Sequence, residues 1–109
     1  MCSVLLLLIC FSAVCQNKKL DSLYTQLNNH PQEDTLRVQL LNNICYYEYT
    51  SDNEKNRVHA NEAFEISKRL NYRFGMGQAL KYKALYYYVI GDYGQATRHA
   101  LEMLQVFES

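Results

Sequence analysis

The chain has 109 residues, with 11 Lys and Arg against 11 Asp and Glu, so its formal net charge is zero. This balance argues against a dedicated nucleic-acid binder, which carries a basic excess or stripe. A share of 49% hydrophobic and 20% charged residues excludes compositional disorder. One Pro and four Gly favour long helices over a loop-rich scaffold, and ten Tyr without any Trp are a marked bias.

Residues 1–15 are almost wholly apolar and carry no charge. The stretch is shorter than the roughly 20 residues of a membrane-spanning helix, but it fits the apolar core of a signal peptide, about 7–15 residues long. Ala13 and Cys15 place small side chains at the −3 and −1 positions of a cleavage before Gln16. We therefore expect export to a periplasmic or other extracytoplasmic location, without direct membrane contact after cleavage. Lipidation at Cys15 and a buried N-terminal helix are the alternatives.

Cleavage changes the cysteine count, because Cys45 is then the one cysteine left. A single thiol cannot form an internal disulfide. Cys45 sits among apolar residues in a helical pattern, which predicts a small core residue rather than a nucleophile.

Residues 16–34 are predicted to form a leading helix and a turn. Leu20, Leu23, Tyr24 and Leu27 recur at three- and four-residue spacing. Pro31 follows and disfavours helical geometry in the residue before it.

Four longer helices follow in the pattern. Asp34 or Thr35 can cap the first, and the polar run 50–53 breaks it. Another helix runs to about Leu70, the next starts near Arg73 and ends at Gly91-Asp92, and the last starts at Tyr93. The apolar faces comprise Leu36, Leu40, Leu41, Ile44 and Cys45; then Ala60, Ala63, Phe64, Ser67 and Leu70; then Met76, Leu80, Ala84 and Tyr87; and then Ala96, Ala100, Met103, Leu104 and Phe107. No segment alternates with period two, so the predicted class is all-α.

The chain also repeats itself. Residues 57–66 match residues 97–106 at an offset of 40, with His, Ala and Glu in common. Upstream, Leu41 and Cys45 correspond to Leu80 and Ala84 at an offset of 39. We therefore expect two helix pairs, residues 35–72 and 73–109, which bury their faces by stacking.

The second unit resembles the tetratricopeptide repeat. The residues that carry the resemblance are Leu80, Ala84, Tyr87, Gly91, Tyr93, Ala96 and Ala100, with Leu41, Cys45, Ala60 and Ala63 in the first unit. The resemblance implies helical hairpins stacked into a superhelix, with these residues in the packing. Departures from the pattern are Lys83 and Met103 in the second unit, and Glu48 and Asn56 in the first.

A narrower resemblance covers most of the mature chain. The residues that carry it are 20–23, 31–35, 37–38 and 40–42, followed by 53–55, Ala60, Glu62, Ala63 and Leu70. They are similar to the exported N-terminal sensor region of bacterial tetratricopeptide sensor histidine kinases and related regulators. This resemblance implies an extracytoplasmic signal-input region of a longer protein, with downstream repeats of the same chain and a protein or peptide ligand as partners. No kinase, membrane-spanning or DNA-binding segment occurs in the sequence.

In such repeats the first helix of each pair lines a concave groove. By resemblance the groove residues are Gln39, Asn42, Tyr46, Tyr49, Gln78, Lys81, Leu85 and Tyr88. Tyr suits a recognition surface because it combines a large apolar face with a hydroxyl group. The alternative is that these rings pack against neighbouring helices.

Signals for chemistry are weak. His59 and His99 occupy equivalent repeat positions, and neighbouring helices lie about 10 Å apart, whereas zinc needs each nitrogen at about 2.0–2.1 Å. Gly75-Met76-Gly77 lacks the strand and the Lys-Ser/Thr of a phosphate loop. We predict no catalytic residue, metal or cofactor. The predicted function is protein or peptide binding, and the alternatives are a structural N-terminal cap of a longer array and an exported adaptor.

Overall fold

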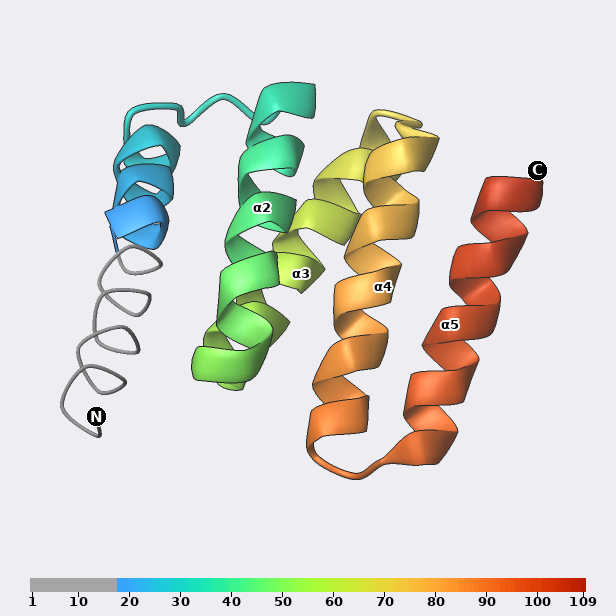
Figure 1. Cartoon of the computed structure of the whole chain (residues 1–109). Coiled ribbons are helices and arrows are strands. Elements are labelled where there is room, and N and C mark those ends of the chain that lie inside the picture. The colour runs from blue at the N-terminus through green and yellow to red at the C-terminus, as the bar shows by residue number, and fades with distance from the viewer. Residues whose placement is uncertain (1–17) are drawn as a thin grey trace, which may run out of the picture.

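The chain is described by a computed structural model over residues 18–109. The predicted signal peptide, residues 1–15, lies outside the described residues. Residues 18–28 are helical, and the longer helices are α2 (Thr35–Ser51), α3 (Asn53–Arg69), α4 (Arg73–Val89) and α5 (Tyr93–Glu108) (Figure 1). No strand occurs in this part of the chain, and the all-α prediction is confirmed.

An aspartate caps the start of three of these helices. The Asp34 carboxylate accepts a hydrogen bond from the backbone N–H of Arg37 at 3.0 Å. Asp52 and Asp92 do the same for α3 and α5. Each bond satisfies a backbone N–H that has no partner within the helix. Asp52 is the single residue between α2 and α3, so the predicted break at 50–53 is confirmed but is only one residue long.

The ends of α3 and α4 share one backbone motif. Asn71 and Gly91 have positive φ angles of 54° and 84°. The N–H groups that follow, of Tyr72 and Asp92, donate back to the carbonyls of Ser67 and Tyr87. This is the arrangement in which a left-handed residue terminates a helix. Gly adopts it without strain, and Asn is the next most tolerant residue.

The helices form two antiparallel pairs laid side by side. In Figure 1, α2 and α4 run in the same direction, α3 lies behind them and α5 forms one edge. α4 packs against α2, α3 and α5, whereas α5 packs against α4 alone among the labelled helices. No described helix is long and apolar enough to cross a membrane.

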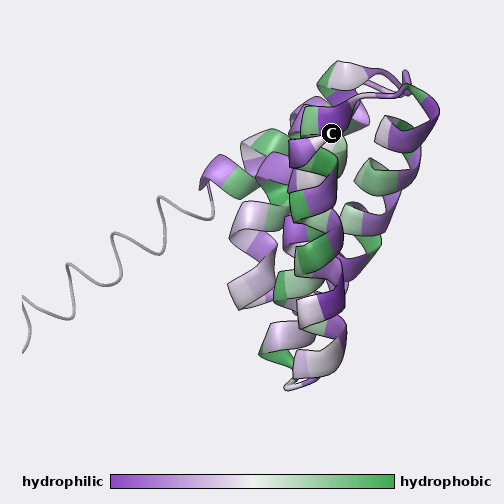
Figure 2. Cartoon of the chain, turned by 90° about the vertical axis from the view of Figure 1, so that its right-hand side faces the viewer, coloured by the Kyte–Doolittle hydropathy of each residue, from purple (hydrophilic) through white to green (hydrophobic). Residues whose placement is uncertain are grey.

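The hydrophobic core lies around α2 and does not reach α5. Its main cluster comprises Leu27, Val38, Leu40, Leu41, Ile44, Ala63, Ile66 and Ala79. Cys45, Ala60 and Tyr82 form a smaller cluster beside it. Within α5 only His99 is buried, and hydrophobic and hydrophilic residues alternate along its outward side (Figure 2). The second pair is therefore held chiefly through α4.

α4 approaches α2 closely at a glycine. A Cβ atom on Gly75 would lie 2.5 Å from the Tyr72 ring and 2.6 Å from the Val38 side chain. The buried amide of Asn42 donates to the carbonyl of Gly75 at 3.2 Å. Only a residue without a side chain allows this contact.

Two further amides attach α3 to α4. Asn53 donates to the carbonyl of Tyr86 at 3.1 Å, and Asn56 donates to the carbonyl of Tyr82 at 3.2 Å. A helix carbonyl has two lone pairs, so it can accept such a bond while it keeps its bond within the helix. Three Asn side chains thus hold one side of α4.

We predict opposite stability effects for two glycine substitutions. Gly75→Ala gains about 1 kcal/mol in helix propensity, but overpacking costs about 1–3 kcal/mol, so we expect a net loss. Gly94→Ala in α5 meets nothing nearer than 3.8 Å and should be stabilising. Urea unfolding measures both, and a Gly75→Ala variant as stable as Gly94→Ala would contradict the close contact.

The capping carboxylate of Asp34 makes stability depend on pH. The Arg37 N–H and the His30 ring lower the pKa of Asp34. The contribution of the ionised Asp34 carboxylate to the free energy of unfolding is therefore present above the pKa of the unfolded chain, about 3.9. It is lost as the pH falls through the lower pKa of the folded state. Asp34→Asn keeps a capping oxygen but cannot titrate. The melting-temperature difference between wild type and Asp34→Asn should shrink below about pH 4. A difference that stays constant between about pH 7 and about pH 3 would contradict the stabilising role of the Asp34 carboxylate.

Candidate binding surface

The predicted groove residues of α2 differ in exposure. Gln39 is exposed and its amide donates to the Tyr72 hydroxyl at 3.3 Å. Tyr46 is 59% exposed. Tyr49 is partly buried and packs against the cluster around Cys45. Two of these three side chains are therefore open to a ligand.

Asn42 has to be removed from the predicted groove set. Its side chain is only 2% exposed, because it lies between α2 and the Gly75 carbonyl of α4. The resemblance to the repeat pattern had placed this position on the groove side of the first helix. The close approach of α4 turns that position inward.

The predicted residues of α4 lie toward α5. Lys81 is exposed and Tyr88 is 61% exposed, whereas Gln78 and Leu85 are partly buried. Lys81, Leu85 and Tyr88 line a shallow space between α4 and α5. They do not share a hollow with Tyr46, so the predicted set is divided between two places.

The first place is a hollow of about 410 Å³ between residues 18–28 and α2, called the α2 hollow below. It is lined by Lys19, Ser22, Leu23, Gln26, Asn43, Tyr46, Tyr47 and Tyr82. The rings of Tyr46 and Tyr47 meet edge to face at 5.0 Å. Burial raises the pKa of Tyr82 to about 12, so its hydroxyl stays protonated. Sequence reasoning missed the contribution of residues 18–28 because no spacing rule relates them to α2.

The second place is a cleft of about 310 Å³ between α4 and α5, called the α4/α5 cleft. It is lined by Lys81, Ala84, Leu85, Tyr88, Ala96, Thr97, Ala100 and Met103. The lining is mostly apolar and small, with a lysine and a tyrosine at its rim.

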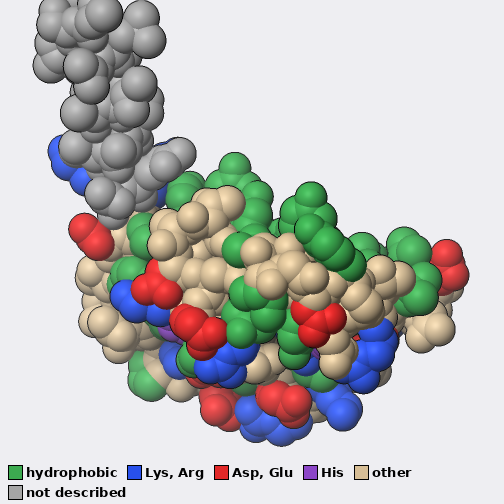
Figure 3. All heavy atoms as spheres, turned by 90° about the horizontal axis from the view of Figure 1, so that it is seen from below, with side chains coloured by type: hydrophobic (Ala, Val, Ile, Leu, Met, Phe, Trp, Pro, Cys, Tyr) green, Lys and Arg blue, Asp and Glu red, His purple; other side chains and the backbone are tan. Residues whose placement is uncertain are grey.

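Both hollows lack acidic residues. Lys19 is the one charged residue of the α2 hollow and Lys81 is that of the α4/α5 cleft. Hydrophobic side chains gather along one edge of the molecule and charged side chains along the opposite edge (Figure 3). The arrangement suits an apolar ligand that carries a negative charge.

The residues predicted to pack between helices differ in their burial. Buried side chains are those of Leu41, Cys45, Ala60, Ala63 and Leu80, and partly buried ones are those of Ala84, Tyr87, Ala96 and Ala100. Tyr87 stacks on His99 with 5.1 Å between ring centroids. Gly91 serves the turn through its positive φ. Tyr93 is 62% exposed and contacts the Tyr88 ring, so its predicted place in the packing is not observed.

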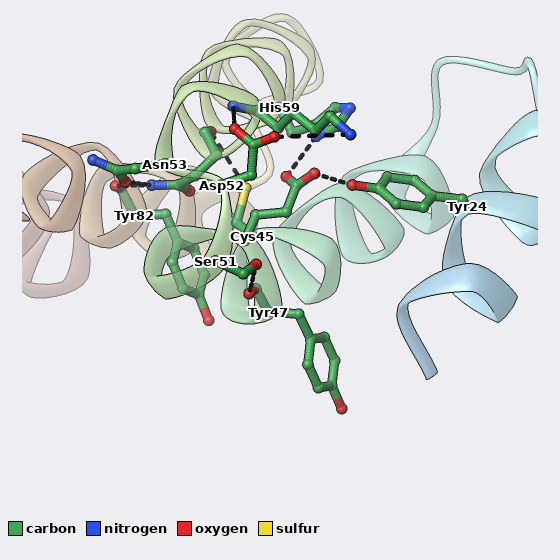
Figure 4. A network of polar contacts seen from close by, with 11 residues as sticks. Tyr24, Cys45, Tyr47, Ser51, Asp52, Asn53, His59 and Tyr82 are labelled. Carbon is green, nitrogen blue, oxygen red and sulfur yellow. Dashed lines mark hydrogen bonds and ion pairs between the residues drawn. The ribbon is translucent and has the colours of Figure 1, made fainter. Parts of the chain in front are cut away.

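Sequence reasoning missed a buried carboxylate. The sequence marked Glu48 only as a departure from the repeat pattern, whereas the structure buries it fully. Its carboxylate accepts a hydrogen bond from the Tyr24 hydroxyl and lies 2.7 Å from Nδ1 of His59. Figure 4 shows the Tyr24 and His59 side chains directed to the carboxylate between them. The spacing of Leu41, Cys45 and Glu48 along one helix face was the available signal.

This triad fixes residues 18–28 to the first helix pair. A buried carboxylate is costly unless each oxygen has a partner, and here the two partners come from residues 18–28 and from α3. Burial and the Glu48 carboxylate raise the pKa of the Tyr24 hydroxyl, so Tyr24 remains a donor. Burial also raises the pKa of the Cys45 thiol, which keeps it protonated and unreactive.

Beside the triad lies a third hollow of about 520 Å³, lined by Tyr24, Glu54, Lys55, Val58 and His59. The lining contains no serine, threonine or cysteine that the Glu48–His59 pair could activate. Residues 18–109 hold no group of three His, Cys, Asp or Glu side chains arranged for a metal ion. The triad is best explained as a structural attachment.

We predict that Tyr24→Phe destabilises residues 18–28 selectively. It removes the donor to a buried carboxylate oxygen, which costs about 1–3 kcal/mol. Amide hydrogen exchange should accelerate in residues 18–28 more than in α4. Tyr46→Phe removes an exposed hydroxyl and is the matched control, with no expected change. Equal exchange rates of residues 18–28 in the two variants would show that the Tyr24–Glu48 hydrogen bond does not stabilise this segment.

Comparisons with known proteins leave the site to be interpreted from its own residues. No family model, no curated protein and no solved structure matches the chain. The α2 hollow and the α4/α5 cleft each combine an exposed tyrosine with a lysine that has no carboxylate partner among residues 18–109.

Proposed function

We propose that the chain is a non-catalytic domain that binds a protein or peptide on the face formed by α2 and α4. The observation that carries the proposal is the pair of exposed tyrosines, Tyr46 and Tyr88, beside two hollows that contain no acidic residue. Large aromatic side chains on a surface lose apolar hydration when a partner covers them. Tyr also loses little side-chain entropy on binding.

The ligand is expected to be apolar with a negative charge. Lys19 and Lys81 have no carboxylate partner within residues 18–109. An acidic group would gain a charge-assisted contact at either hollow. A basic ligand would place like charges together.

We also propose a biological setting from the resemblance of the sequence to exported tetratricopeptide sensor regions. In that setting the domain is the extracytoplasmic input of a bacterial sensor or regulator, and the bound ligand is the signal. The hollow beside His59 is lined by no serine, threonine or cysteine, and the hydroxyl of Tyr24 in its lining donates to the buried Glu48 carboxylate. These contacts favour a non-catalytic role.

A second candidate function is a structural cap whose surface receives further repeats. It is favoured by the exposed apolar side chains at the far end of the chain, with Leu101 at 55% and Leu104 at 49% exposure. The two functions differ in whether the tyrosines of α2 contact a ligand.

Peptide selection tests the binding function. Peptides of 12 residues selected from a displayed random library on the protein are titrated by calorimetry into the wild type and the Tyr46→Ala/Tyr88→Ala variant. We expect the variant to lose about tenfold or more in affinity, as central aromatic contacts do.

Val58→Ala is the control, because Val58 is 52% exposed on α3 and lines neither the α2 hollow nor the α4/α5 cleft. It should bind as the wild type does. Equal affinity of all three proteins, with unchanged circular dichroism, would remove the tyrosines from the binding site and favour the structural cap.

A further inference from the structure

The α4/α5 cleft is the internal equivalent of the place that α4 occupies. At the offset of 39, Lys81, Ala84 and Tyr88 correspond to Asn42, Cys45 and Tyr49 of α2. At the offset of 40, Ala96, Ala100 and Met103 correspond to Asn56, Ala60 and Ala63 of α3. Six of the eight lining residues of the cleft thus have their counterparts in the surface beneath α4.

The counterparts are covered by α4. Asn42 and Asn56 bond to the carbonyls of Gly75 and Tyr82. Tyr49 lies against the Tyr82 ring at 6.3 Å, and Ala60 packs with Tyr82 in one cluster. The surface formed by α2 and α3, called the first position below, is thus covered by the helix α4.

The second position is the α4/α5 cleft, and no helix among the described residues covers it. Leu104 corresponds to Phe64 and is 49% exposed, whereas Phe64 is partly buried and has the Lys83 ammonium of α4 over its ring at 4.4 Å. Tyr88 is likewise 61% exposed, and its counterpart Tyr49 is partly buried. Equivalent surfaces are therefore covered on the first helix pair and exposed on the second.

The two positions differ in their polar groups. The Asn amides that hold the α4 backbone are replaced by Lys81 and Ala96. The Ala96 side chain offers no hydrogen bond. The Lys81 ammonium lies over the Tyr82 ring at 4.8 Å and has no carboxylate partner among residues 18–109. A cation at the rim of an apolar cleft selects a partner with a carboxylate. Tyr88 and Tyr93 beside it are typical of an interface with a separate molecule rather than of a permanent core.

We propose that the α4/α5 cleft binds one amphipathic α-helix of a separate protein, which places a carboxylate against Lys81. This proposal rests on the proposed binding function. It specifies the kind of partner that binds at the α4/α5 end of the face formed by α2 and α4. The helix lies on the cleft as α4 lies on α2 and α3, with small residues where the backbones approach and aromatic residues farther along.

The required pattern is read from α4. The α4 residues that contact α2 and α3 are Gly75, Ala79, Tyr82 and Tyr86, and they are spaced i, i+4, i+7 and i+11. This spacing forms one stripe on a helix. In α4, Gly75 at position i meets Asn42, which is the counterpart of Lys81. The carboxylate of the bound helix is therefore placed at i+3, one turn from position i on the same side of the helix.

The probe is a pair of synthetic 17-residue helical peptides. Both carry Gly, Ala, Tyr and Tyr at i, i+4, i+7 and i+11 on an alanine and glutamine background. One has Glu at i+3 and the other has Lys. Each is titrated into isotope-labelled protein, and chemical-shift changes are mapped by nuclear magnetic resonance.

Charge exchange is the decisive comparison. The Glu peptide should shift the resonances of Ala84, Ala100 and Met103 and should bind about fivefold tighter than the Lys peptide. In the Lys81→Glu variant the preference should reverse. Lys19→Glu is the matched control, because it alters the α2 hollow and should leave the preference unchanged.

Three outcomes overturn the proposal. They are equal binding of the two peptides to the wild type, shifts confined to the α2 hollow, and concentration-dependent self-association that Ala100→Arg abolishes, which would make a second copy the occupant. If the library-selected peptides still bind at Tyr46 in any of these cases, the helix proposal fails and the proposed function stands. If neither class of peptide binds, both fail.

Discussion

The seating of α4 on the first helix pair is the contact on which the rest of the structure depends. The Gly75 backbone lies where any side chain would collide with Tyr72 and Val38, and three Asn amides bond to α4 carbonyls. A backbone approach of this kind removes water from polar groups, which must then be paired within the protein. Because α5 packs only on α4 among the labelled helices, the position of the second pair follows from this contact.

The departures from the tetratricopeptide-like pattern have physical partners. Glu48 pairs with Tyr24 and His59, and Asn56 bonds to the Tyr82 carbonyl. Lys83 lies over the Phe64 ring, and burial lowers its pKa. Each polar residue therefore connects two helices, and specific bonds replace part of the apolar packing. Such groups are costly when one partner is lost, so they also define which helices can be neighbours.

Burial decreases from the first helix pair to the last helix. The clusters around α2 contain most of the buried apolar side chains, whereas α5 contributes only His99. Apolar surface left open at one end of a stacked structure favours association, because covering it releases hydration water. The two hollows lie at successive helix pairs along the stack, and each has one lysine and exposed tyrosine at its rim. The proposed recognition of a partner and the alternative role as a cap for further repeats thus draw on the same kind of surface.

The amino-acid sequence by itself determined the helical class, the starts of α2, α4 and α5, and the 39–40-residue period. These are local properties: apolar spacing, capping aspartates and turn residues act within a few positions of the chain. The predicted ligand residues were less accessible to this reasoning. Tyr46, Lys81 and Tyr88 are exposed, but Asn42 is buried and Tyr93 is not, and residues 18–28 complete a hollow that no spacing indicated. Only the tertiary structure decided these points, because whether a polar side chain faces solvent or a neighbouring carbonyl depends on how closely α4 approaches, and Gly75 and Tyr72 determine that distance together with α2.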